Sequence, residues 1–243
     1  MAKRRRVRAW VKAILILVPV IAGITCLIIF GFKLKDIDYK SDLNEFTKED
    51  VKAYLDKNDI NNAFTLWFRD LIGQDREIVL FEDYSVRLKS NSKVEIEAHE
   101  KQFMGYIKKD KLNYYFDEDG TLLKITDYKY KGVPKVKGIE IVKGDLYQKI
   151  KVSDKKQFKL VVRLAKAIAP YDFDVKKFLV NKNREVSVYI KKIQVDLGKA
   201  DNLKKKLSDL NDMYEKVIKR KGILDMKKVN NEGKYIIKQS KNN

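Results

Sequence analysis

An uninterrupted apolar run lies near the start of the sequence. The twenty residues at 13–32 carry no charged side chain, and thirteen of them are Ile, Leu, Val or Phe. A helix of that length spans about 30 Å, which matches the hydrocarbon core of a membrane. Pro19 and Gly23 weaken the tendency to insert but do not reverse it. The pattern therefore predicts one transmembrane helix over residues 13–32.

Charge flanks this run unequally. The head at residues 1–12 has six basic side chains and no acidic one, and its anchoring residues are Arg4, Arg5, Arg6, Trp10 and Lys12. Basic flanks favour the cytoplasmic side, whereas a long folded region can cross the membrane despite its charge. We expect a cytoplasmic N-terminus and an extracytoplasmic bulk. The alternative is a cleaved signal peptide, but the run is longer than a usual signal core and no small-residue cleavage site follows it.

Residues 33–101 follow the pattern of a small α+β domain. Thr47 is a good N-cap residue, and Asp50 three residues later can complete the cap. Helical spacing of apolar residues and period-two alternation predict the other elements. In order, they are a strand at 32–39, a helix from Thr47, a helix at 63–71, and a hairpin of strands 84–88 and 94–98. The order strand, helix, helix, strand, strand predicts a βααββ domain.

Residues 102–228 follow the pattern of a second, β-rich domain with two helices. The expected strands lie at 103–107, 113–116, 122–125, 186–190, 193–197 and 223–226, and the expected helices run from Ser153 or Asp154 to Ala169 and from Asp201 to Lys219. The tail at 229–243 is polar and rich in Lys, so we expect it to be loosely ordered. The predicted fold class is α+β: one N-terminal transmembrane helix, a βααββ domain and a mixed, β-rich domain.

The formal net charge of +19 limits the choice of partners. Beyond the head, 47 basic and 34 acidic residues remain, which favours anionic partners such as lipid headgroups or anionic wall polymers. Nucleic acid is not expected, because the charge is spread along the chain and most aromatic residues occupy periodic core positions.

Few residues could support catalysis or metal binding. The single cysteine, Cys26, lies in the apolar run, and the single histidine, His99, falls on the polar side of a strand end. The acidic segment 117–120 is explained by a tight turn, since a calcium loop placed on it would begin at Tyr115 and end at Thr126. We therefore expect no catalytic site, no metal and no cofactor.

Five short motifs follow one another along the chain. They are KVEIEAHEK at 93–101, YYFDEDG at 114–120, GVPKVKG at 132–138, the passage 195–207 with Gly198, Leu203, Lys206 and Leu207, and GILDM at 222–226. Their order, together with the basic head and single membrane helix, resembles the FtsQ/DivIB family of bacterial cell-division proteins. The resemblance spans roughly residues 30–228. One departure is Gln102-Phe103, where the family usually has a proline after the acidic-basic pair.

The resemblance implies a fold and a function. Residues 33–101 would be a POTRA domain and residues 102–228 a β domain. The protein would be a non-enzymatic divisome scaffold at the septum. It would bind division proteins of the FtsL and FtsB/DivIC type and help to recruit and regulate septal peptidoglycan synthesis. Two alternatives are a membrane-anchored envelope adaptor unrelated to division, for example in sporulation, and a surface hydrolase. Mid-cell localisation of a fusion favours division, and a uniform or polar pattern favours the adaptor.

The last expected strand is the candidate partner-binding site. A strand at a sheet edge exposes backbone groups to which a partner strand can add. We expect the strand formed by Ile223, Leu224, Asp225 and Met226 to lie at the sheet edge and to bind a partner strand. The alternative is that the strand is paired on both sides within the sheet.

Overall fold

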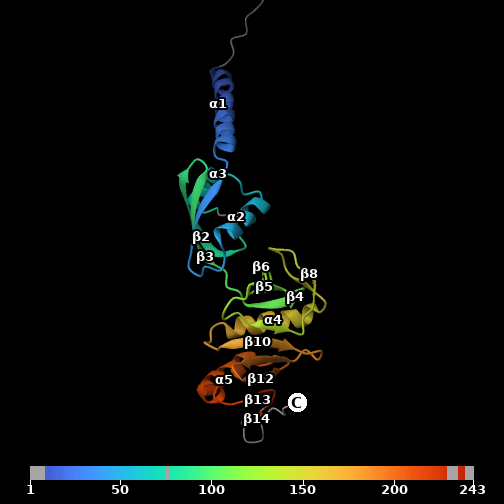
Figure 1. Cartoon of the computed structure of the whole chain (residues 1–243). Coiled ribbons are helices and arrows are strands. Elements are labelled where there is room, and N and C mark those ends of the chain that lie inside the picture. Colours follow the sequence, from blue (N-terminus) through green and yellow to red (C-terminus); the bar gives the residue numbers. More distant parts are fainter. Residues whose placement is uncertain (1–8, 75–76, 229–234, 239–243) are drawn as a thin grey trace, which may run out of the picture. The chain divides into compact units, whose positions relative to one another are not determined.

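A computed structural model describes residues 9–74, 77–228 and 235–238 of the chain (Figure 1). The protein folds as two compact units, residues 1–101 and 102–243. The head residues Arg4, Arg5 and Arg6, which we expect to anchor the cytoplasmic side, lie outside the described residues.

Helix α1, Ala9–Gly31, has the length and composition to cross a membrane. The most apolar stretch of this helix is not buried inside the protein at all. Its side chains therefore have no protein core to pack into. Pro19 lies within the helix, while Trp10 and Lys12 are exposed near its start. The prediction of a single N-terminal membrane helix is confirmed for the described part of the chain, with a start a few residues earlier than the apolar run.

The rest of unit 1 has the predicted order strand, helix, helix, strand, strand. Its elements are β1 (Asp36–Ser41), α2 (Lys48–Lys57), α3 (Ala63–Leu71), β2 (Phe81–Ser90) and β3 (Lys93–Glu100). The sheet order is β1-β3-β2, in which β1 is parallel and β2 antiparallel to β3. Thr47 caps α2 as expected: Asp50 N donates to Thr47 Oγ1 (3.2 Å), and Thr47 N donates to Asp50 Oδ2 (2.8 Å).

The first strand begins at Asp36, later than the predicted Phe32. Phe32 and Leu34 bond to the start of α3 and the loop before it, and Lys35 N donates to the Ser92 carbonyl in the turn between β2 and β3 (2.8 Å). The Phe32 carbonyl accepts from Ala63 N (2.8 Å), and Leu34 N donates to the Asn61 carbonyl (2.8 Å). An apolar pattern cannot distinguish these loop contacts from strand pairing, and for this reason the predicted start was wrong.

Unit 2 is built on one long mixed sheet with two helices. Its strands are β4 (Gly105–Lys109), β5 (Leu112–Phe116), β6 (Leu122–Thr126), β7 (Lys135–Lys137), β10 (Val175–Val180), β11 (Val186–Ile190), β12 (Ile193–Gly198), β13 (Gly222–Asp225) and β14 (Ile236–Lys238). A separate pair is formed by β8 (Ile141–Lys143) and β9 (Lys151–Val152). The order of the nine-stranded sheet is β14-β13-β12-β11-β10-β7-β4-β5-β6.

Two amphipathic helices line the core of unit 2. Helix α4 (Lys155–Ile168) contacts β9 and β10, α5 (Leu203–Val217) contacts β12, and the two helices contact each other. Asp154, one of the two expected caps, begins α4 by accepting from Gln157 N (3.0 Å). The fold class is confirmed: one apolar N-terminal helix, a βααββ unit and a β-rich unit with two helices.

The tail differs from the prediction. Residues 236–238 form β14, which pairs antiparallel with β13, so the expectation of a loosely ordered tail is wrong for this segment. Ile236 and Ile237 supply the β-branched residues that a short strand favours. The remaining parts of the predicted tail, 229–234 and 239–243, lie outside the described residues.

Candidate interaction surfaces

The predicted partner-binding strand lies second from the end of the nine-stranded sheet. β13 pairs with β12 on one side and with β14 on the other. The expectation that it forms the sheet edge is therefore wrong, because the chain returns after β13 and adds one more strand. Leu224 and Met226 face the core and are 1% and 0% exposed, whereas Ile223 and Asp225 are half-buried. A partner role for these four residues stays a prediction.

Strand β14 is held in place by side chains as well as by the sheet. Tyr235 Oη donates to Asp209 Oδ2 (2.7 Å), and Lys238 Nζ lies 2.8 Å from Asp225 Oδ2. Burial, together with the Asp209 carboxylate, raises the pKa of Tyr235 to about 12. Beyond β14, no further strand pairs among the described residues, and Ile236 is 48% exposed. The outer side of β14 is therefore the available edge at this end of the sheet.

A row of aromatic and basic residues crosses the middle of the same sheet. Strand register places Tyr106 beside Lys135, Lys135 beside Lys177, and Lys177 beside Tyr189. Lys177 Nζ lies 3.5 Å from the centre of the Tyr189 ring. Burial, with the charges of Lys137 and Lys135, lowers the pKa of Lys177. We call Tyr106, Lys135, Lys177 and Tyr189 the lysine row.

Sequence reasoning did not find the lysine row, because β7 and β10 were not predicted. β7 has only three residues, and the register of β10 shifts between Val175 and Lys177. Neither segment shows clean alternation, and their parallel pairing is non-local. No pattern in the sequence brings Lys135 and Lys177 together.

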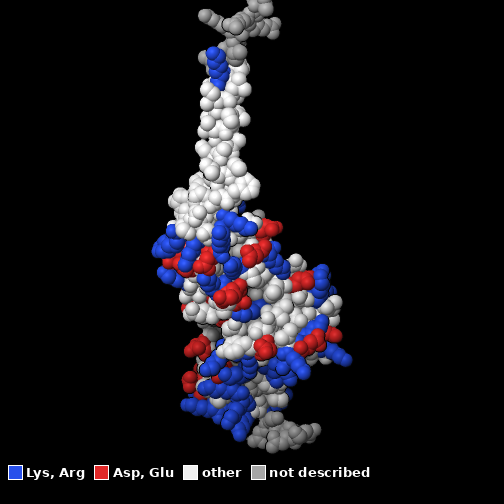
Figure 2. All heavy atoms as spheres, turned by 45° about the horizontal axis from the view of Figure 1, so that its top comes forward, with Lys and Arg blue, Asp and Glu red and all other residues white. Residues whose placement is uncertain are grey.

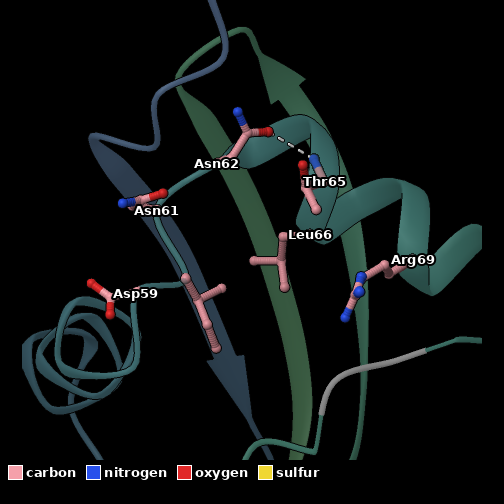
Figure 3. Close-up of a pocket in the computed structure, with 7 residues that line it drawn as sticks. Asp59, Asn61, Asn62, Thr65, Leu66 and Arg69 are labelled. Atoms are coloured by element: carbon pink, nitrogen blue, oxygen red, sulfur yellow. Dashed lines mark hydrogen bonds between the residues drawn. The ribbon is translucent and has the colours of Figure 1, made fainter. Parts of the chain in front are cut away.

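Unit 1 has a small polar hollow beside the end of α1 (Figure 3). Its lining residues include Asp59, Asn62, Thr65, Leu66 and Arg69. Asn62 Oδ1 caps α3 by accepting from Thr65 N (2.8 Å), and Asn62 Nδ2 donates to the Ile28 carbonyl in the last turns of α1 (2.9 Å). The hollow therefore marks the joint between the membrane helix and the βααββ part of unit 1.

His99 is a surface residue, as the strand alternation predicted. Its side chain is 67% exposed, with Nδ1 3.1 Å from Asp42 Oδ2 and Nε2 3.8 Å from Asp83 Oδ1. The hydrogen bond to Asp42 and the charge of Asp83 raise the pKa of His99. Within the described ranges, no group of three or more His, Cys, Asp or Glu side chains could hold a metal ion.

The fold and these surfaces define a membrane-anchored module of two α+β units. Residues 104–232 match the family described as FtsQ/DivIB, C-terminal related. The cell division protein DivIB of Clostridium botulinum (strain Loch Maree / Type A3) is 25% identical over 247 residues, covering 97% of this chain and 94% of that protein. The chain belongs to the FtsQ/DivIB family of cell-division proteins. This family is non-catalytic, and membership supports a role in cell division.

Proposed function

We propose that this protein is a non-enzymatic scaffold of the division machinery. Its N-terminus lies in the cytoplasm, its two units lie outside, and it acts at the septum. It binds membrane partners of the FtsL and FtsB/DivIC type and helps to recruit and regulate septal peptidoglycan synthesis. The observation that carries this proposal is the family match over residues 104–232, which covers nearly all of unit 2, including β13.

Partner capture takes place at the end of the sheet formed by β13 and β14. A partner segment adds as a strand along the outer side of β14, where backbone hydrogen bonds supply affinity. Exposed Ile236 offers a side-chain contact, and the Lys238–Asp225 pair holds the receiving strand in register. The strand proposed from the sequence, Ile223 to Met226, then supports β14 from the inner side.

Removal of residues 235–243 from the full-length chain should reduce capture of an FtsB/DivIC-type partner by at least about tenfold, because the receiving strand is lost. The measurement is a pull-down from detergent-solubilised membranes with the tagged chain. The matched control removes only residues 239–243 and keeps β14 (Ile236–Lys238). If the chain that lacks residues 235–243 captures the partner undiminished, β14 is not the receiving strand. If that chain captures more of the partner, the partner strand binds to β13 instead.

The lysine row supports a second binding function, toward anionic wall polymers. Like charges at Lys135 and Lys177 stand side by side across β7 and β10, and Lys137 is close enough to affect Lys177. An anionic polymer relieves this repulsion, and Tyr189 offers a ring against which a sugar can pack. We propose that this part of unit 2 contacts anionic wall polymer during septation.

The double change Lys135→Gln and Lys177→Gln should weaken binding to purified wall polymer about tenfold, if each of these half-buried lysines contributes about 0.7 kcal/mol. Co-sedimentation at low and at high salt measures the loss, and added salt should reduce the difference. The control, Lys143→Gln with Lys176→Gln, removes the same charge from two exposed sites outside the lysine row, one in β8 and one beside Lys177 in β10. Equal weakening by both pairs of changes would show that only net charge matters.

A further inference from the structure

Helix α3 carries an apolar face that unit 1 leaves uncovered. Phe68, Leu71 and Ile72 are 43%, 62% and 46% exposed, and Phe64 and Trp67 beside them are half-buried. The ring centre of Phe64 lies 5.6 Å from that of Trp67 and 5.7 Å from that of Phe68. These five residues form one continuous surface, which we call the α3 face. Exposed apolar surface of this kind marks an interaction site.

The orientation of α3 is fixed by contacts that its remaining residues make with the rest of unit 1. Ala63 and Leu66 are buried in unit 1, at 0% and 4% exposure. Asp70 Oδ2 accepts from Val86 N in β2 (2.9 Å), and Asn62 caps the start of the helix. The α3 face therefore cannot turn inward without breaking these contacts.

The α3 face begins where the chain leaves the membrane helix. Ala63 N donates to the Phe32 carbonyl (2.8 Å), and Asn62 Nδ2 donates to the Ile28 carbonyl (2.9 Å). The Phe32 and Phe64 rings lie 5.3 Å apart, so the aromatic cluster continues directly from the end of α1. On the side shown in Figure 2, uncharged surface runs from α1 onto the adjoining part of unit 1.

We propose that the α3 face is a second membrane contact, seated in the interfacial layer of the bilayer that α1 crosses. Trp67 lies at headgroup depth, and Phe68 and Leu71 point toward the upper acyl chains. Aromatic rings favour this layer, and short amphipathic helices lie in its plane with the apolar face down. Lys33 and Lys35, both exposed just after α1, supply cations for lipid phosphates. Unit 1 is thereby held against the membrane at two points.

The test uses Trp67 as its own reporter. The chain has two tryptophans, so Trp10→Phe leaves Trp67 as the only one. The full-length chain is reconstituted into phosphatidylcholine–phosphatidylglycerol vesicles whose acyl chains carry bromine either near the headgroup or near the chain end. We expect shallow bromine to reduce Trp67 emission about twofold and deep bromine to reduce it less. Equal emission in brominated and ordinary vesicles would overturn the proposal.

Two further comparisons identify what covers the face. Phe68→Ser with Leu71→Ser should lessen the quenching, whereas Tyr128→Ser with Val142→Ser, which are exposed apolar residues in unit 2, should leave it unchanged. Trp67 emission that changes with the protein-to-lipid ratio but is the same in brominated and ordinary vesicles would assign the face to a second copy of the chain and overturn the proposal. The quenching measured with the α3 face intact is decisive even if the double serine variant fails to fold.

Discussion

Glu100→Ala should destabilise unit 1 by about 3 kcal/mol, because it removes the shared acceptor of one buried and two half-buried donors. Glu100 is 2% exposed and ends β3. Its carboxylate accepts from Tyr39 Oη (2.5 Å), Glu45 N (2.6 Å) and Phe46 N (3.3 Å). Burial and the adjacent carboxylate raise the pKa of Tyr39, so the phenol stays a donor at neutral pH. Alanine leaves these donors without the carboxylate.

Denaturant unfolding of the full-length Trp10→Phe chain, followed by Trp67 emission, measures this effect in unit 1, since unit 2 contains no tryptophan. Glu97→Ala is the matched control on the same strand. Glu97 has a 56% exposed side chain and a 3.7 Å contact with Arg87, so its loss should change stability by less than about 0.5 kcal/mol. Equal effects of the two changes would mean that the Glu100 network adds nothing to stability.

Local signals in the sequence predicted unit 1 well. The Thr47–Asp50 pair placed the start of α2, and helical spacing gave α3 its observed bounds, Ala63–Leu71. The hairpin of β2 and β3 followed from period-two alternation, and Arg87 contacts Glu95 and Glu97 across the strands. These features depend on residues a few positions apart, which single-sequence patterns detect.

Unit 2 was harder to predict because its sheet depends on contacts between distant segments. β10 has adjacent lysines and a register shift, and β7 is three parallel-paired residues, so neither carries a strand pattern. β14 was missed within a polar tail, and this error placed the predicted edge on the wrong strand. Lys206, noted only as part of a family motif, proves to be 7% exposed: it donates to the Leu197 carbonyl (2.8 Å) and to Asp201 (2.8 Å).

Gly138→Ala should destabilise unit 2 by about 4 kcal/mol, because the new methyl group has no space and the backbone is unfavourable. Gly138 has a φ of +87°, and an added Cβ would lie 1.9 Å from the carbonyl oxygen of Val180. Gly138 directly follows β7 and Val180 ends β10, and these two strands pair with each other. β7 is the strand that joins β6-β5-β4 to the rest of the sheet. Moving it apart from β10 therefore weakens the junction between the two halves of unit 2.

Gly132→Ala is the matched control, since both glycines belong to the same motif. Gly132 also has a positive φ, +80°, but an added Cβ would meet nothing within 4 Å. Its replacement should cost only the backbone strain, about 1 kcal/mol. Circular dichroism during denaturant unfolding gives both values, and amide exchange in β10 and β11 locates the weakened region. If the two substitutions cost the same, the close approach of Gly138 to Val180 does not set the stability of the junction, and the left-handed conformation alone accounts for both glycines.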